Sequence, residues 1–211
     1  EYYACFLRDM MKTSRNYQAR LTEGMRVVYS GVEGAFAHIA AKRAFPNAQL
    51  FSVEDFKKAY HAVENGEYDC AVLPIENSSN GSVRAVYDLL QRQHLSIVRS
   101  TRLCIRHELL GLPGAKAEEL TEIYSHPQAI GQCARFLDSL SGVRVIPCDN
   151  TATASKMVAE RKDPHVAALS SHACAELYGL SVLNENVQDS DNNYTRFICV
   201  SKDPAIYAGA S

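Results

Sequence analysis

Two short clusters of hydrogen-bonding residues border apolar runs in this chain. The first, Glu76-Asn77-Ser78, directly follows the apolar run 71–75. The second, Thr195-Arg196, lies within the segment 193–197. Together they supply a carboxylate, an amide, hydroxyls and a guanidinium, groups that can bind carboxylates and hydrogen-bond to a departing oxygen. Taken alone, the first cluster is more typical of an ordinary strand-to-helix loop with turn and N-cap residues.

The elements around these clusters predict how they are positioned. The run 71–75 suits a buried strand of a parallel sheet, with Pro74 near its end because Pro cannot donate a ladder hydrogen bond. Residues beyond the carboxyl end of such a strand lie where open α/β sheets bind ligands. Strand patterns occur at 26–30, 49–52, 70–75, 95–105, 121–125, 143–147, 165–169, 182–183 and 194–201, and helical patterns separate most of them. This alternation predicts an α/β protein with mostly parallel sheets.

Composition narrows the class of partner. The chain has 211 residues, 46% of them apolar, and a formal net charge of −2 from 22 Lys and Arg against 24 Asp and Glu. It has no basic block, so we expect a small-molecule partner and no nucleic acid. No apolar run approaches the roughly 18 residues that a membrane span needs. We therefore expect no membrane partner and a cytoplasmic location.

Metal and phosphate motifs are weak or absent from the sequence. The seven Cys are scattered without a C-x-x-C pair, and the seven His have no ligand spacing. We expect reduced Cys and no metal. The turn 31–34 lacks the full G-x-G-x-x-G pattern, so it favours close strand-to-helix packing over a phosphate loop. Ser30 and Gly31 are still candidates for facing a carboxylate.

Taken together, these motifs resemble the prephenate dehydratase family. The matching segments follow the family order over about residues 26–203, and they are 29–36, 73–78, 81–82 with 87–90, 125–129 with 132–133, 149–152, 175–180 and 193–197. The resemblance implies two lobes like those of type II periplasmic binding proteins, with the active site between them. It also implies loss of carbon dioxide and water from prephenate to give phenylpyruvate, in phenylalanine biosynthesis and without a cofactor.

The resemblance implies roles for individual residues. Thr195 is the expected donor to the departing hydroxyl, and Glu76 accompanies it only if burial protonates the carboxyl group. Asn77, Ser125 and Gln132 are expected as neutral donors that complete the catalytic set. Further substrate-binding candidates are Ser30, Gly31, Ser78, Thr151, Thr153 and Arg196.

One of these residues, Arg196, and one further position, Ala37, carry a reservation. Arg196 follows Thr195 in a strand and should point to the opposite face, where a salt bridge between lobes is the alternative role. Ala37 stands where many relatives have Ser, which puts one minor cleft contact in doubt.

Residues 1–24 form an N-terminal helix and linker that resemble the last helix of a chorismate mutase, with Ser14 and Gln18 matching. A plain amphipathic helix fits equally well, and we expect no mutase activity. Residues 25–204 form the predicted dehydratase domain, with lobe 1 at about 25–103 and 187–204 and lobe 2 at about 104–186. Because the sequence stops at Ser211, we expect a fragment of a bifunctional enzyme without the regulatory domain that binds phenylalanine.

Two rival functions fit the same residues. Arogenate dehydratase performs the same reaction on a substrate with an amino group in place of the keto group. A two-lobed module that binds a small anion without catalysis would share the architecture. Relatives of this type also suggest a homodimer.

Overall fold

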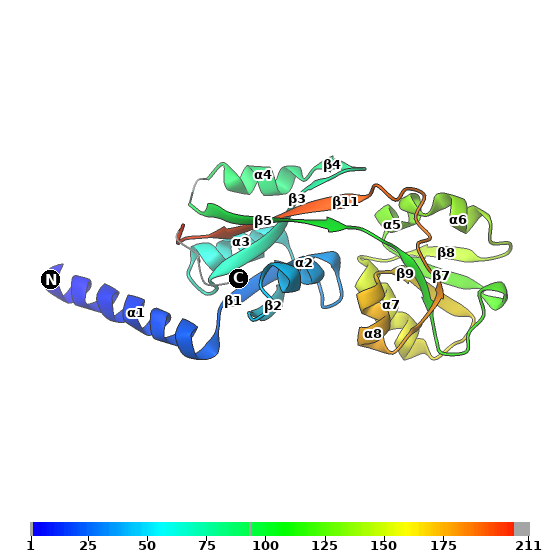
Figure 1. Cartoon of the computed structure of the whole chain (residues 1–211), viewed down its shortest axis with the longest axis horizontal. Helices are drawn as coiled ribbons and strands as arrows, with labels where there is room; N and C mark the ends of the chain where they lie inside the picture. Colours follow the sequence, from blue (N-terminus) through cyan, green and yellow to red (C-terminus); the bar gives the residue numbers. More distant parts are fainter. Residues whose placement is uncertain (1, 93, 205–211) are drawn as a thin grey trace.

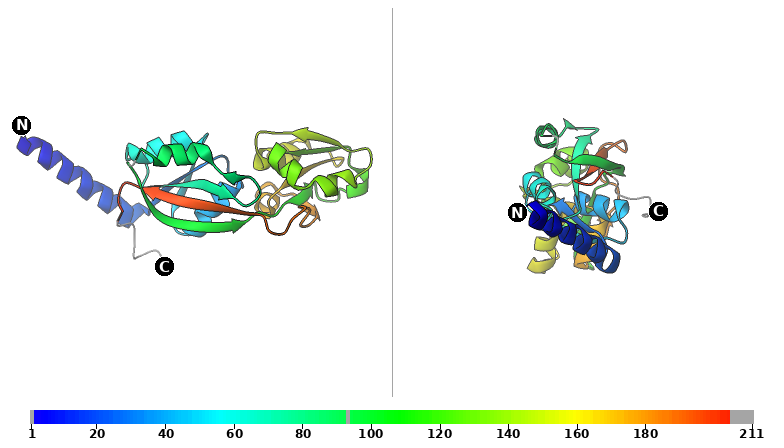
Figure 2. Two further views of the ribbon diagram at one scale, coloured as in Figure 1. Left: turned by 90° about the horizontal axis from the view of Figure 1, so that it is seen from above. Right: turned by 90° about the vertical axis from the view of Figure 1, so that its left-hand side faces the viewer.

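The computed structural model describes residues 2–92 and 94–204, which form one long helix and two α/β lobes (Figure 1). Helix α1 (Tyr2–Glu23) extends away from both lobes, as Figure 1 and the left view of Figure 2 show. It carries six of the exposed large apolar side chains, those of Tyr2, Tyr3, Phe6, Leu7, Met10 and Met11. None of the described helices is long and apolar enough to cross a membrane.

Lobe 1 is built on a sheet of order β2-β1-β3-β11-β5, with β4 paired to β3. Its strands are β1 (Arg26–Ser30), β2 (Gln49–Val53), β3 (Cys70–Asn77), β4 (Gly81–Ser82), β5 (Ser96–Cys104) and β11 (Tyr194–Ser201). Its helices are α2 (Phe36–Ala44), α3 (Phe56–Glu64) and α4 (Arg84–Leu90). Two buried apolar clusters, one containing Val27 and the other Val28, pack on opposite faces of this sheet, as alternating strand residues require.

Lobe 2 repeats this arrangement with the order β10-β6-β9-β7-β8. Its strands are β6 (Glu108–Gly111), β7 (Glu122–Ser125), β8 (Arg144–Pro147), β9 (Val166–Ser170) and β10 (Ser181–Asn184). Its helices are α5 (Pro127–Gln132), α6 (Ala134–Asp138), α7 (Thr151–Arg161) and α8 (His172–Tyr178), with a short 3-10 helix η1 (Ala117–Glu119).

Both sheets are mixed, which refines the expectation of mostly parallel strands. In lobe 1 the late strand β11 runs antiparallel between β3 and β5. In lobe 2 strand β6 runs antiparallel between β9 and β10. Strand β6 directly follows the first segment that joins the two lobes, and strand β11 directly follows the second. Each of these strands therefore enters its sheet from the side of the other lobe. The expected two-lobed α/β class is confirmed.

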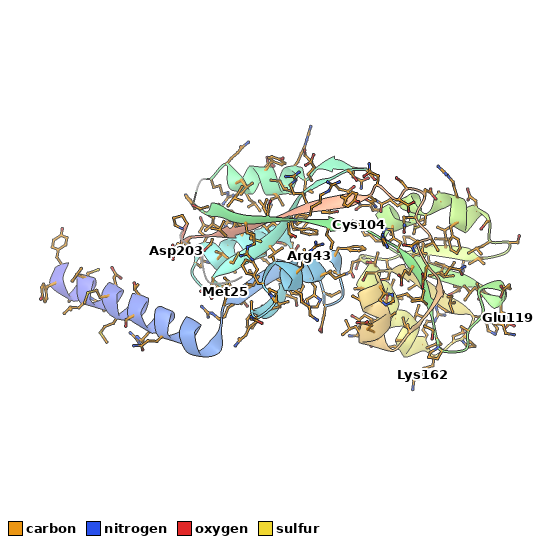
Figure 3. All side chains as sticks on the ribbon, viewed as in Figure 1. Met25, Arg43, Cys104, Glu119, Lys162 and Asp203 are labelled. Atoms are coloured by element: carbon orange, nitrogen blue, oxygen red, sulfur yellow. The ribbon has the colours of Figure 1, made fainter. Side chains whose placement is uncertain are left out.

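The chain crosses between the lobes twice. The first crossing leaves β5 at Cys104, which lies between the two lobes in Figure 3, and enters β6. The second runs from β10 to β11. The two segments are tied together, because the backbone N–H of Ile105 donates to the carbonyl of Asn193 at 2.8 Å and that of Val187 donates to the carbonyl of His107 at 2.9 Å.

Local capping explains where the site-bearing helices begin. Asn150 caps α7 by accepting from the N–H of Thr153 at 2.7 Å. His126 caps α5, and Pro127 occupies its first turn, where its missing N–H costs nothing. Helix α5 ends at Cys133, and α6 begins directly after it, so this helical stretch is split there. At this point the second crossing segment takes a hydrogen-bond acceptor of the helix, because the N–H of Asp189 donates to the carbonyl of Gln132 at 2.7 Å.

Lobe 1 touches lobe 2 at Gly34. The hydroxyl of Ser171 donates to the carbonyl of Gly34 at 3.0 Å. Gly34 has φ +87°, and a Cβ atom there would lie 2.7 Å from the Sγ atom of Cys174. Only glycine satisfies both the left-handed backbone and this close approach.

Candidate functional site

A cavity of about 450 Å³ lies between the lobes. Lobe 1 and the start of the first crossing contribute Ser30, Ala35, Phe36, Ala37, Phe56, Pro74, Asn77, Val83, Ile105, Thr195 and Phe197. The rest of the wall is formed by His107, His126, Gln128, Ala129, Gln132, Asp149, Asn150 and Thr151. The wall is therefore largely apolar, with a limited set of hydrogen-bonding groups that includes one carboxyl side chain, that of Asp149, as expected for a small-molecule site.

Asn77 and Thr195 lie side by side on strands β3 and β11. The Nδ2 atom of Asn77 donates to the hydroxyl oxygen of Thr195 at 2.9 Å. Its Oδ1 atom accepts from the backbone N–H groups of Ser79 and Asn80, both at 3.0 Å, which fixes the orientation of the amide. Because Thr195 uses its oxygen as an acceptor here, its own proton is available to a ligand.

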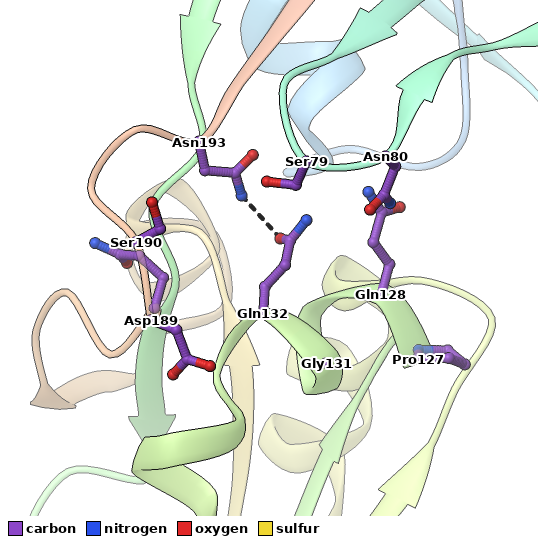
Figure 4. Close-up of a pocket in the computed structure, with 10 residues that line it drawn as sticks. Ser79, Asn80, Pro127, Gln128, Gly131, Gln132, Asp189, Ser190 and Asn193 are labelled. Carbon is purple, nitrogen blue, oxygen red and sulfur yellow. Dashed lines mark hydrogen bonds between the residues drawn. The ribbon is translucent and has the colours of Figure 1, made fainter.

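The hydrogen bonds continue from Asn77 across the crossing segments into lobe 2. Asn77 Nδ2 also donates to Asn193 Oδ1 at 3.0 Å, and Asn193 Nδ2 donates to Gln132 Oε1 at 2.9 Å (Figure 4). The Nε2 atom of His107 lies 2.9 Å from the same Gln132 oxygen. These contacts form one chain, the amide chain, that runs from Thr195 through Asn77, Asn193 and Gln132 to His107.

His107 is 2% exposed, and burial lowers the pKa of its imidazole because the charged form loses hydration. The hydrogen bond to Gln132 acts in the opposite direction but has the smaller effect on this pKa. The ring is therefore neutral near pH 7. An amide oxygen can only accept, so the proton sits on Nε2.

A second hollow of about 440 Å³ adjoins the cavity and shares Gln128 and Gln132 with it. Figure 4 shows Ser79 and Asn80 of lobe 1 facing these two glutamines across the gap between the lobes. The cavity therefore opens along the β3–β4 turn.

Two helices begin at the cavity, one from each lobe. Residues Phe36 and Ala37 of α2 and Thr151 of α7 line it. The first N–H groups of a helix lack partners within the helix and attract anions. No Lys or Arg is among the described lining residues, so an anion bound here would rely on such neutral donors. Within the described part of the chain, no group of three or more His, Cys, Asp or Glu side chains is arranged to hold a metal.

The structure brings five of the sequence-predicted site residues together and leaves others outside. Those lining the cavity are Ser30, Asn77, Gln132, Thr151 and Thr195. Ser125 is 0% exposed and donates to the carbonyl of Leu169 at 2.7 Å, so its hydroxyl stabilises the lobe 2 sheet. The hydroxyl of Ser78 donates to the carbonyl of Asn192 at 2.9 Å, which joins the end of β3 to the second crossing.

Glu76 and Arg196 lie away from the cavity. They pair across β3 and β11 on the face opposite to Asn77 and Thr195, because neighbouring strand residues alternate. Their side chains are 54% and 56% exposed and stand 3.8 Å apart. This pair lies within lobe 1, which corrects the expected salt bridge between lobes, and exposure removes the burial that a protonated Glu76 would require.

Gly31 and Thr153 each make a backbone hydrogen bond outside the cavity. The N–H of Gly31 donates to the carbonyl of Val53 at 2.8 Å, which ties the start of the 31–34 turn to β2. The N–H of Thr153 serves the Asn150 cap. Neither residue lines the cavity.

His107 and Asn193 were missed by sequence reasoning. Strand alternation could have found Asn193, since residues 193, 195 and 197 share one face of an extended chain. The same spacing links Ile105 to His107, but the predicted strand stopped at residue 105. No sequence pattern marked the point where two distant crossing segments meet.

Comparisons with known proteins place this geometry in context. The family model described as prephenate dehydratase matches residues 27–205. Arogenate dehydratase/prephenate dehydratase 1 of Arabidopsis thaliana is 43% identical over 182 residues, which are 86% of this chain and 46% of that protein. The chain thus spans about half the length of the curated relatives it matches.

Two solved structures share the fold closely. A prephenate dehydratase from Arthrobacter aurescens in complex with L-Phe has a TM-score of 0.78 and 30% identity, over 84% of this chain and 60% of that one. A protein described as GqqA, a novel type of quorum quenching acylase, has a TM-score of 0.77 and 33% identity, over 85% of this chain and 65% of that one.

Proposed function

This chain belongs to the prephenate dehydratase family, and on that premise we propose that it converts prephenate to phenylpyruvate, as a carbon–oxygen lyase of phenylalanine biosynthesis. The observation that carries the proposal is the Thr195 hydroxyl, buried in the cavity with its oxygen held by Asn77 and its proton available. The reaction needs such a donor and no redox chemistry.

The reaction balances around the departing hydroxyl. The ring carbon–carboxylate bond breaks and releases carbon dioxide, and its electron pair moves through the ring to expel the hydroxyl on the opposite carbon. That oxygen leaves as water once it has gained a proton, and the ring becomes aromatic. The protein must therefore align both leaving groups and stabilise negative charge on the departing oxygen.

The proposed roles follow from the geometry. Thr195 donates a hydrogen bond to the departing oxygen, and Asn77 holds the Thr195 oxygen so that its proton faces the ligand. A Thr hydroxyl is a very weak acid, so it acts through this hydrogen bond or passes on a proton from water. Gln132 and the N-termini of α2 and α7 supply donors for the carboxylates. Ser30 and Thr151 are additional contacts.

Acyl hydrolysis, as the name of GqqA suggests for that protein, is less well supported here. A hydroxyl nucleophile needs an adjacent base. Among the described contacts, Thr195 is bonded to an amide, and His107 stands at the far end of the amide chain.

The remaining expectations are proposals as well. Residues 25–204 would be the catalytic domain and residues 1–24 a helix and linker of chorismate mutase type. A homodimer and a cytoplasmic location are proposed from the sequence, although the Arabidopsis relative carries the word chloroplastic in its name. Sedimentation and imaging of a tagged chain test these two points.

The activity is tested by following phenylpyruvate formation from prephenate, measured by absorbance in alkali. Turnover by the folded chain supports the proposal. A folded chain that binds prephenate without converting it would support the binding-module alternative.

A further inference from the structure

The imidazole ring of His126 is held in one orientation. Its Nδ1 atom accepts from the backbone N–H of Gln128 at 3.2 Å, which caps α5. A backbone N–H can only donate, so Nδ1 carries a lone pair there and the ring proton is on Nε2. Because Nδ1 faces the start of the helix, the Nε2–H group on the far side of the ring is the donor that His126 can offer to a ligand.

This donor can be reached from the cavity. His126 is half-buried and lines the cavity. Within residues 2–92 and 94–204, the buried side-chain nitrogen and oxygen atoms without a partner belong to Tyr60, His107, Gln132 and Asn184. The Nε2 atom of His126 is not one of these buried atoms, and no hydrogen bond joins it to another described residue. It is therefore an accessible donor.

The wall of the cavity attracts anions poorly by charge. It has no Lys or Arg among the described lining residues, and its one carboxyl side chain there, that of Asp149, is exposed. Burial lowers the pKa of the His107 imidazole, so that ring adds no positive charge near pH 7. A substrate with two carboxylates must then be bound by directed N–H and O–H donors.

Two such donors meet at one edge of the lobe 2 sheet. Strands β7 and β8 are paired, with Ser125 opposite Pro147, and the N–H of Cys148 extends the pairing by donating to the carbonyl of Ser125 at 2.7 Å. His126 and the start of α7, which follow these strands, are therefore neighbours. The first N–H groups of α7 lack acceptors within the helix, and Thr151 lines the cavity. A carboxylate has an oxygen for each of the two donors.

The two carboxylates of prephenate differ in what binding does to the reaction. The ring carboxylate leaves as carbon dioxide and loses its charge, so a donor bound to it stabilises the ground state more than the transition state. The side-chain carboxylate keeps its charge and is retained in phenylpyruvate. It projects from the ring carbon opposite the hydroxyl, away from Thr195. His126 also lies away from the amide chain, since it begins α5 about 9 Å along the helix from Gln132.

We propose that the Nε2–H group of His126 binds the side-chain carboxylate of the substrate, beside the first turn of α7. This inference rests on the proposed function. The contact is the same in the substrate, the transition state and the product, so it contributes to KM and not to kcat. The helix cap keeps the ring in its donating orientation.

A matched pair of variants separates the donor from the cap. In His126→Asn the amide oxygen can still accept from the Gln128 N–H, because Asn is a preferred residue at this helix position, while the donor at Nε2 is lost. In His126→Gln the longer side chain can place its amide nitrogen near the position of Nε2, while the cap is lost. Circular dichroism confirms folding, and steady-state kinetics with prephenate give kcat and KM separately.

A matched pair of ligands tests the carboxylate without turnover. Phenylpyruvate carries the side-chain carboxylate, and phenylacetone has a methyl group in its place. Calorimetry gives the Kd of both ligands for the wild type and each variant. The ratio of the two Kd values measures what the carboxylate contributes to binding.

We expect His126→Asn to raise the KM of prephenate and the Kd of phenylpyruvate by similar factors of about 10 to 100, as for a lost hydrogen bond to a charged group. The value of kcat should stay within about threefold, as for a contact made equally in the ground and transition states. The Kd of phenylacetone should not change. His126→Gln should stay closer to the wild type in KM and in the Kd of phenylpyruvate.

An unchanged Kd of phenylpyruvate in folded His126→Asn, or equal weakening of phenylpyruvate and phenylacetone, would overturn the inference and leave the proposed function intact. A fall in kcat without a change in KM would also overturn it, because His126 would then act in the chemical step. A wild-type chain that binds phenylpyruvate through His126 but does not convert prephenate would contradict the proposed function and support the carboxylate contact.

Discussion

The amide nitrogen of Asn77 lies 2.9 Å from the hydroxyl oxygen of Thr195, across two adjacent strands of lobe 1. This contact brings together two motifs that are more than a hundred residues apart in the sequence. It leaves the Thr195 proton free inside a cavity that both lobes line. Catalysis as proposed depends on this pair, so changes at either residue should be felt in turnover.

Replacing the Asn77 amide by a carboxylate should distinguish the role of its N–H donor from the role of its oxygen acceptor. The carboxylate of the Asn77→Asp variant keeps an acceptor for the Ser79 and Asn80 N–H groups but can no longer donate to Thr195 or Asn193. We expect kcat to fall strongly and the free energy of unfolding to drop by about 1–3 kcal/mol, because Asn193 Oδ1 loses its partner. Urea denaturation and steady-state kinetics measure both. The exposed neighbour Asn80, changed to Ala, serves as the control and should retain activity.

Replacing Glu76 by Gln should have little effect. Glu76 and Arg196 form an exposed ion pair outside the cavity, and such pairs contribute about 0–1 kcal/mol. We expect kcat/KM to change by less than about tenfold, which corresponds to ~1.4 kcal/mol. A much larger loss in kcat with normal folding would show that Glu76 reaches the substrate after all.

Gly34→Ala should loosen the contact between the lobes. An added methyl would meet Cys174 Sγ at 2.7 Å, and the positive φ disfavours any side chain. Gly66→Ala is a matched control, because Gly66 also has a positive φ but nothing within 4 Å of an added Cβ. We expect about 1–2 kcal/mol of destabilisation from backbone strain in both variants, and a further 1–3 kcal/mol or so from overlap in Gly34→Ala. KM should rise only for Gly34→Ala, and equal effects in the two variants would contradict this role.

Acid should weaken lobe 2 through Glu122. Hydrogen bonds from Tyr124, then from Arg144 and Arg161, lower the pKa of the Glu122 carboxyl group from 4.5 to about 2. Because the folded pKa lies below the ordinary one, the stabilisation is fully present above about pH 4.5 and is lost as pH falls toward 2. The difference in unfolding free energy between wild type and Glu122→Gln should therefore shrink over this window. A difference that stays constant would exclude the mechanism, and exposed Glu118→Gln is the control.

Local sequence patterns predicted much of the fold and about half of the residues in the candidate site. Apolar runs and caps located most strands and helices, because their signals are contained in a few neighbouring residues. The short strand β4 and strand β6 were missed, since their pairing depends on distant partners. Asn77 and Thr195, the site residues predicted from the two strand motifs, both line the cavity.

The remaining site residues depend on where the crossing segments meet. Ser125 has the chemistry of a ligand contact, but the carbonyl of Leu169, forty-four residues away, captures its hydroxyl. Conversely, His107 belongs to no sequence motif and enters the cavity because Gln132 and the second crossing hold it there. Such competition between polar partners is decided by tertiary packing.

The most direct test of the central claim is phenylpyruvate formation from prephenate by the wild type, Thr195→Val and Thr195→Ser. Val keeps the shape of the side chain, and Asn77 Nδ2 still has acceptors on Asn193 and Tyr194, so folding should persist. We predict that Thr195→Val lowers kcat by about 10²–10⁴-fold, whereas Thr195→Ser retains most of the turnover. A folded Thr195→Val variant with turnover close to that of the wild type would contradict the assignment of Thr195 as the donor to the departing oxygen.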